Sequence, residues 1–183
     1  MTNNIRILKI IGFKKEDMGM VRDFYPLIDE HIKGIVDDVV SVLAEDYEVV
    51  LILKNNNLSV DRAKSVFVYI FKFIFSHGID NEFFETVRKV GLKHVEANVK
   101  ERFVLKALSL FRNRIIETIF AGGSNLSVDR ILAVNKLFDL VGIVMISSYR
   151  DEVNFRNRAL IKFMGINEKL LERIVEEGKK IEE

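Results

Sequence analysis

Cysteine and tryptophan are absent from this sequence of 183 residues, and proline occurs once. Without cysteine the chain cannot form disulfides, thiolate zinc sites, iron–sulfur clusters or a cysteine nucleophile. With a single proline and no long Gly/Ser tract, no interdomain linker is evident. Neither sign of charge is in excess, since 28 basic and 27 acidic residues give a formal charge of +1. We therefore expect neither nucleic acid nor an anionic membrane as a partner.

Long apolar runs are also missing. The N-terminal MTNNIRILKIIGF lacks the apolar run and small-residue cleavage site of a signal peptide. The most apolar stretch, VFVYIFKFIF (66–75), is too short to span a bilayer and is interrupted by Lys72. With 49% hydrophobic and 30% charged residues, the composition favours a soluble, cytoplasmic protein that can bury a core.

Helical periodicity dominates what is present. Apolar residues recur three and four apart through 27–43, 63–74 and 83–94, as on one face of an α-helix. The segment 46–54 fits either a strand or a short helix. No stretch alternates as a sheet would, so we predict an all-α protein. Further helices are expected at 101–120, 127–158 and 166–181.

The hexapeptide NLSVDR occurs twice, at 57–62 and 125–130. In both copies a serine, Ser59 or Ser127, can accept a hydrogen bond from the first turn of the helix that follows. The aspartate two residues later suits the positive end of the helix dipole. Because the flanking sequences do not repeat, we interpret the hexapeptide as a shared helix start and not as a duplicated domain.

No enzyme motif is present. The sequence has no P-loop, no nucleotide-binding glycine fingerprint and no H-E-x-x-H, and we do not expect an enzyme. Of three histidines, His31 lies at the margin of an apolar stripe and His77 near a helix end. His94 differs because it continues the buried stripe of 83–90. On periodicity alone, a lone histidine there is more often a core residue than a metal ligand.

The segment FSHGIDNEFFETVRKVGLKHVEANVKERFVLKAL (75–108) resembles the sensor-globin family, which comprises the haem domains of globin-coupled aerotaxis transducers and their protoglobin relatives. An upstream segment, IGFKKEDMGMVRDFYPLIDEHIKGIVDD (11–38), resembles the run into that family's second helix. The resemblance covers about 5–150. It implies a globin-like helical sandwich at 1–158 with an N-terminal extension, followed by an amphipathic helical tail at 159–183. The family pattern matches without a gap at Phe75, Asp80, Glu82, Phe83, Arg88, Val90, Gly91 and His94.

The same resemblance implies that haem b is the cofactor and that His94 is its axial iron ligand. The implied distal wall consists of Val40, Ala63, Val66 and Phe67, and the proximal wall of Val90, Val104 and Leu108. The chain departs from the family at several of these positions, because Val40 replaces a tyrosine and Val66 replaces a polar residue. These departures predict an unusually apolar distal pocket.

Two functions remain open at this stage. The first is a haem-binding sensor or carrier of O2, CO or NO; the second is a haem-free globin-fold signalling module with a closed or apolar-ligand cavity. The family also implies a homodimer through 101–120 and 127–158, and a downstream signalling protein that the sequence does not identify. Apolar residues on more than one face of 137–148 favour the dimer, although full burial within one chain would explain them equally.

Overall fold

The computed structural model describes residues 2–123 and 127–163, together with Gly165 and Arg173. This part of the chain forms eight helices and contains no strand, which confirms the all-α prediction. The helices are α1 (Thr2–Ile11), α2 (Lys15–Asp23), α3 (Tyr25–Ala44), α4 (Tyr47–Asn55), α5 (Val60–Ser76), α6 (Asn81–Glu96), α7 (Glu101–Ala121) and α8 (Val128–Phe163).

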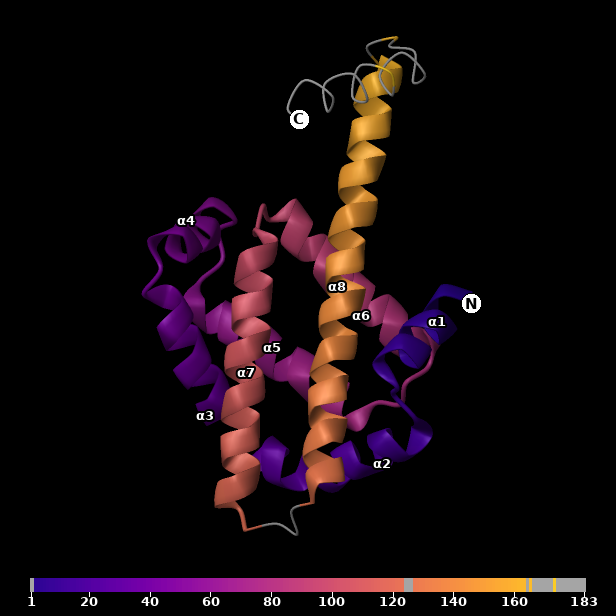
Figure 1. Ribbon diagram of the computed structural model, residues 1–183. Coiled ribbons are helices and arrows are strands. Elements are labelled where there is room, and N and C mark those ends of the chain that lie inside the picture. Colours follow the sequence, from indigo (N-terminus) through magenta and orange to yellow (C-terminus); the bar gives the residue numbers. More distant parts are fainter. Residues whose placement is uncertain (1, 124–126, 164, 166–172, 174–183) are drawn as a thin grey trace, which may run out of the picture.

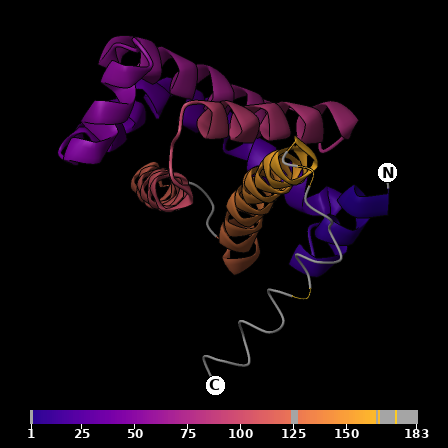
Figure 2. The same ribbon diagram turned by 90° about the horizontal axis from the view of Figure 1, so that it is seen from above.

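The helices form two layers. Helices α7 and α8 lie side by side in front, and α3, α5 and α6 lie behind them (Figure 1). The view from above separates the layers, with α5 and α6 on one side and α7 and α8 on the other (Figure 2). Helix α3 packs mainly on α5 and α7, whereas α8 packs mainly on α6, α7 and α2. The far end of α8 projects beyond the body of the protein.

Local capping interactions begin the helices as the sequence predicts. The Ser59 hydroxyl accepts a hydrogen bond from the Arg62 N–H at 3.2 Å, at the start of α5. The Ser127 hydroxyl accepts one from the Arg130 N–H at 3.3 Å, at the start of α8. Both copies of the repeated hexapeptide therefore act as helix starts. Asp80 caps α6 in the same way, with the Phe83 N–H at 3.0 Å.

Four helices were left open, not predicted or predicted with other bounds. Segment 46–54 is the helix α4, because Asp46 caps it through the Glu48 N–H at 3.1 Å. Helices α1 and α2 were not predicted as separate elements. Helix α8 continues to Phe163, five residues past its predicted end, so the proposed boundary between 158 and 159 lies within it. The predicted helix at 166–181 lies outside the described residues, apart from Arg173.

Phenylalanine rings fill the centre of the molecule where α5, α7 and α8 meet. The Phe71 ring lies 4.1 Å from that of Phe111 and 6.1 Å from that of Phe138, measured between centroids. Phe111 is 1% exposed. Such tilted aromatic pairs combine a large buried apolar area with favourable ring geometry.

Helix α8 is long and apolar enough to cross a membrane by length and composition, but 56% of its apolar window is buried within the protein. The apolar excess of 137–148 has the same explanation. The sequence favoured a dimer interface here, with full burial within one chain as the alternative. Most of this segment is covered by neighbouring helices, and Ile143 is its exposed large apolar residue at 39%. Packing within one chain therefore accounts for the apolar residues of 137–148, so they no longer support a dimer.

Candidate functional site

The facing sides of α5 and α6 define the candidate site. On α5, Val66, Ile70 and Phe73 follow at spacings of four and three residues, so they share one face. The Phe73 ring lies 6.2 Å from the Phe83 ring of α6, which shows that this face looks toward α6. At the other end of both helices, the Asn56 side chain donates a hydrogen bond to the Ala97 carbonyl at 3.0 Å. We call the part between these two contacts the α5–α6 region.

His94 belongs to this region. It lies eleven residues after Phe83, which is close to three full turns of helix, and so points to the same side of α6. Gly91, one turn earlier, faces α8 instead, because a Cβ built there would lie 2.9 Å from the Met145 carbonyl oxygen. Helix α6 is thus anchored on α8 by one edge and presents His94 from the adjacent edge.

The hydrogen bonds of His94 determine which ring nitrogen is available. Its Nδ1 lies 2.7 Å from the Val90 carbonyl oxygen, which can only accept, so Nδ1 carries the proton. Burial lowers the pKa of His94 below its ordinary value of 6.5, although the bond to Val90 opposes this shift. The imidazole is therefore neutral, and its Nε2 lone pair has no hydrogen-bond partner among the described residues.

The other two histidines have different surroundings. His31 also directs Nδ1 at a carbonyl oxygen, that of Leu27 at 3.0 Å, but its side chain is exposed. The Nε2 atom of His77 lies 3.3 Å from Asp80 and 3.8 Å from Glu82, so carboxylates occupy its surroundings. Only His94 combines partial burial with a free Nε2 atom.

The predicted wall residues differ in burial. Val40, Ala63 and Val104 are buried at 3%, 6% and 4% exposure. Val66 is 52% exposed, so other residues of the protein leave about half of this side chain uncovered. It lies two turns before Phe73 on the face of α5 that looks toward α6. The remaining wall residues, which are Phe67, Val90 and Leu108, are half-buried.

Sequence reasoning missed the contribution of α4. Asn56 reaches the α6–α7 turn three residues after His94, and Glu48 reaches Lys100 at the start of α7 at 2.8 Å. No local signal could have shown these pairs, because 41 and 52 residues separate the partners along the chain. A separate surface cavity of about 320 Å³ lies between α2 and the start of α8 and includes none of the predicted site residues.

Comparisons with known proteins bear on the family and the fold of the chain. The protoglobin family model matches residues 5–155. The chain belongs to the protoglobin family. A solved structure, the globin domain of a Geobacter sulfurreducens globin-coupled sensor, is similar with a TM-score of 0.71 and 23% identity, over 79% of this chain and 96% of that one. That likeness confirms the globin-like fold. No match was found among curated proteins.

In this protoglobin, the candidate ligand atoms consist of the His94 imidazole nitrogen, which fits a haem whose iron has one protein ligand. A neutral imidazole with Nδ1 bonded to a backbone carbonyl is a common arrangement for a metal-ligating histidine, because the bond fixes the tautomer and the ring. The Val99 N–H further holds the His94 carbonyl at 2.9 Å. No group of three or more His, Asp or Glu side chains in the described part of the chain could hold a metal ion by itself.

Proposed function

We propose that this protoglobin binds haem b through His94 Nε2 and senses or carries a diatomic gas. The observation that carries the proposal is the half-buried His94 imidazole, whose Nδ1 is bonded to the Val90 carbonyl oxygen and whose Nε2 has no hydrogen-bond partner among the described residues. Family membership supports a globin-type gas sensor. When bound, the haem supplies an iron atom that can take up O2, CO or NO.

The chain's own residues would orient the iron-binding His94 ring and exclude water from the haem. The Val90 carbonyl keeps the His94 ring in one orientation, and the buried side chains of Val40 and Ala63 are apolar. No predicted distal residue carries a hydroxyl or amide. Since a hydrogen bond to a charged or strongly polar group contributes about 1.5–3 kcal/mol, we propose that oxygen binds weakly relative to carbon monoxide.

One observation favours the haem-free alternative. The Phe67 ring lies 5.2 Å from that of Phe111, so aromatic side chains already fill the space between α5 and α7. A chain that keeps this packing would act as a binding module without a prosthetic group. The accessible His94 Nε2 argues for haem, because the described residues leave one buried side-chain polar atom without a partner, the Tyr149 hydroxyl, and His94 Nε2 is therefore open to an incoming ligand.

A visible absorption spectrum distinguishes the two functions. We expect the purified protein mixed with hemin to show the intense near-ultraviolet band of bound haem. His94→Ala should abolish specific haem retention on a desalting column. His31→Ala is the matched control, because His31 has the same Nδ1–carbonyl contact on an exposed position. Equal haem stoichiometry in His94→Ala and the unmodified protein would refute the assignment.

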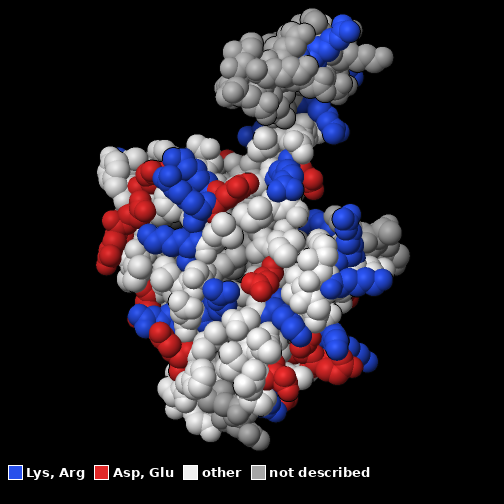
Figure 3. All heavy atoms as spheres, viewed as in Figure 1, with Lys and Arg blue, Asp and Glu red and all other residues white. Residues whose placement is uncertain are grey.

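We further propose that the outward face of α7 and α8 pairs with a second copy of this chain. The exposed apolar residues of α7 and α8 include Leu105, Phe120, Leu132 and Ile143. Arg112 and Asp139 approach to 3.7 Å between the two helices. Figure 3 shows uncharged atoms over the middle and lower parts of α7 and α8, interrupted by a central group of charged side chains, with further charged groups toward the upper end. A downstream signalling protein would then receive the state of this dimer.

A further inference from the structure

Helix α4 contacts the rest of the protein through half-buried apolar side chains, among which Val49 packs against the core, and through polar contacts to α7. It contains the apolar run Val49–Leu53, yet none of its residues is buried. The Glu48 carboxylate accepts from Lys100 Nζ at 2.8 Å and also pairs with Arg102. Asp46 lies 3.8 Å from Lys106. These partners lie in or immediately before the first two turns of α7.

Helix α4 lies at the end of the α5–α6 region that has no aromatic contact. Near the 77–80 connection, Phe73 and Phe83 bring α5 and α6 together. Fourteen residues further along α6, the link between the helices is the hydrogen bond from Asn56 to Ala97. Asn56 is the residue that ends α4, so α4 and its polar contacts span from the start of α5 to the turn after His94.

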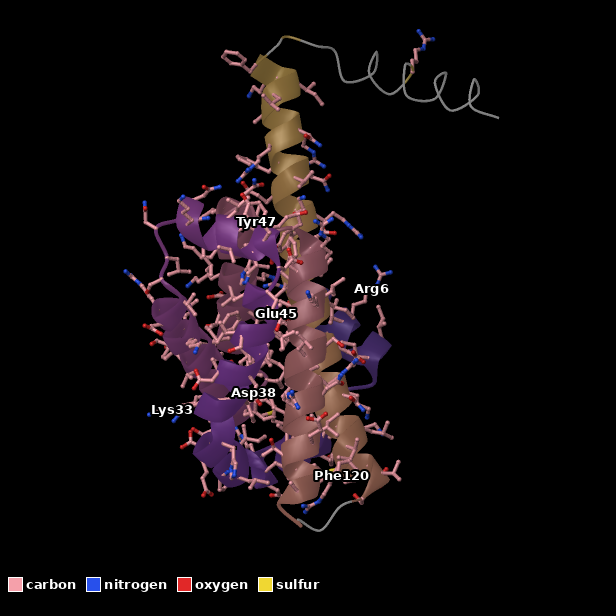
Figure 4. All side chains as sticks on the ribbon, turned by 90° about the vertical axis from the view of Figure 1, so that its left-hand side faces the viewer. Arg6, Lys33, Asp38, Glu45, Tyr47 and Phe120 are labelled. Carbon is pink, nitrogen blue, oxygen red and sulfur yellow. The ribbon has the colours of Figure 1, made fainter. Side chains whose placement is uncertain are left out.

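Short turns flank α4 on both sides. Glu45 and Asp46 separate it from α3, and Asn57, at φ +50°, ends it in the left-handed conformation. Figure 4 shows Glu45 and Tyr47 at the upper junction between α3 and α4, away from the base of the bundle. Tyr47 is 73% exposed. A short helix between two turns, with half-buried but no fully buried residues, is of the kind that opens locally while the core stays folded.

We propose that α4 is a hinged cover, held by its ion pairs to α7, whose opening admits the prosthetic group to His94. This inference rests on the proposed function, because it assigns the entry route of the same site. Exposed ion pairs contribute little individually and are screened by salt. Opening α4 therefore requires loss of the Glu48 and Asp46 pairs and the Asn56 hydrogen bond, without separation of α7 from α8.

Hydrogen exchange on the haem-free, full-length chain tests the cover directly. We expect Glu48→Gln to speed amide exchange within α4 about threefold or more at low salt, since two ion pairs are lost. High salt should produce the same increase in the unmodified chain and little more in the variant. Glu45→Gln is the matched control, because Glu45 is a neighbouring exposed glutamate without an ion pair among the described residues. Exchange within α8 should not change in any of these chains.

Hemin uptake provides the second readout. Glu48→Gln should take up hemin faster than the unmodified chain or Glu45→Gln, by a factor similar to its increase in α4 exchange. Equal α4 exchange in Glu48→Gln and the unmodified chain would overturn the ion-paired cover. Faster exchange with an unchanged uptake rate would overturn its role in entry. If no chain shows a haem absorption band, the proposed function itself fails, and α4 exchange alone then decides whether the ion pairs hold it closed.

Discussion

The hydroxyl of Tyr149 is buried without a hydrogen-bond partner among the described residues, and the residue is 5% exposed. Burial raises the pKa of Tyr149 above its ordinary value, with the charge of Glu101 acting in the same direction. An unpaired buried polar group costs about 1–3 kcal/mol. We therefore expect Tyr149→Phe to raise the free energy of unfolding of the haem-free chain by about 1 kcal/mol. Urea denaturation followed by circular dichroism measures this change.

Tyr25 supplies the control for that measurement. Its hydroxyl donates a hydrogen bond to Asp29 at 3.1 Å, so Tyr25→Phe removes an interaction that is made. We expect this variant to be equal to or less stable than the unmodified chain. A loss of stability in Tyr149→Phe would instead show that the Tyr149 hydroxyl has a partner in solution.

Asp80 makes the start of α6 sensitive to acid. The hydrogen bond from the Phe83 N–H lowers the pKa of Asp80 below its ordinary value of 3.8, and His77 acts in the same direction. A carboxylate with a lowered pKa in the folded state stabilises the fold above its unfolded pKa. That contribution is lost as the pH falls through the folded value, so the affected window lies below about pH 4.

The variant Asp80→Asn isolates this effect, because asparagine still offers an oxygen to the Phe83 N–H but does not titrate. We expect the unmodified chain to lose more stability than Asp80→Asn between about pH 4 and pH 2. Thermal unfolding of both proteins across this range provides the measurement. Parallel stability curves would show that the Asp80 carboxylate has no favourable charge interaction in the fold.

At the scale of elements, the contact between α6 and α8 depends on Gly91. A Cβ at this position would lie 2.9 Å from the Met145 carbonyl oxygen and 3.0 Å from the Ser148 Cβ. Both atoms belong to a helix that cannot move aside cheaply. We expect Gly91→Ala to destabilise the fold by about 1–3 kcal/mol, although alanine is the better helix former.

Gly142 on α8 is the matched control for Gly91. A Cβ there would meet the Leu108 Cδ1 at 3.5 Å, which is ordinary van der Waals contact. Gly142→Ala should therefore be neutral or stabilising, by up to about 1 kcal/mol. Calorimetric unfolding of both variants separates the steric cost of a Cβ between α6 and α8 from the gain in helix propensity. Similar stability of the two alanine variants would mean that α6 shifts freely along α8.

At the scale of the whole molecule, the outward face of α7 and α8 carries the proposed dimer. Ile143, at the middle of α8, is 39% exposed and lies one turn beyond Asp139. Placing a charge there should weaken association at least tenfold, which corresponds to about 1.4 kcal/mol. We expect Ile143→Asp to shift the protein toward monomer in light scattering at micromolar concentration. Ile10→Asp is the control, since Ile10 is 70% exposed on α1. A monomeric unmodified chain would contradict the dimer.

The sequence by itself determined the features that depend on neighbours along the chain. Ser59 and Ser127 could be predicted to begin helices, because a cap bonds to a residue three positions away. The apolar stripe that placed His94 on a buried face reflects a helical repeat of 3.6 residues. The family motifs around His94 identified the globin fold for the same reason, since they lie within one continuous segment.

The tertiary structure decided everything that depends on partners distant in sequence. The exposure of Val66, the burial of the apolar middle of α8 and the docking of α4 through Glu48 each result from how separate helices pack. The free Nε2 of His94 is also of this kind, because it depends on which atoms of other helices come near. Periodicity states which face of a helix is apolar, but only the packed structure states whether a neighbouring helix, a prosthetic group or a second chain covers that face.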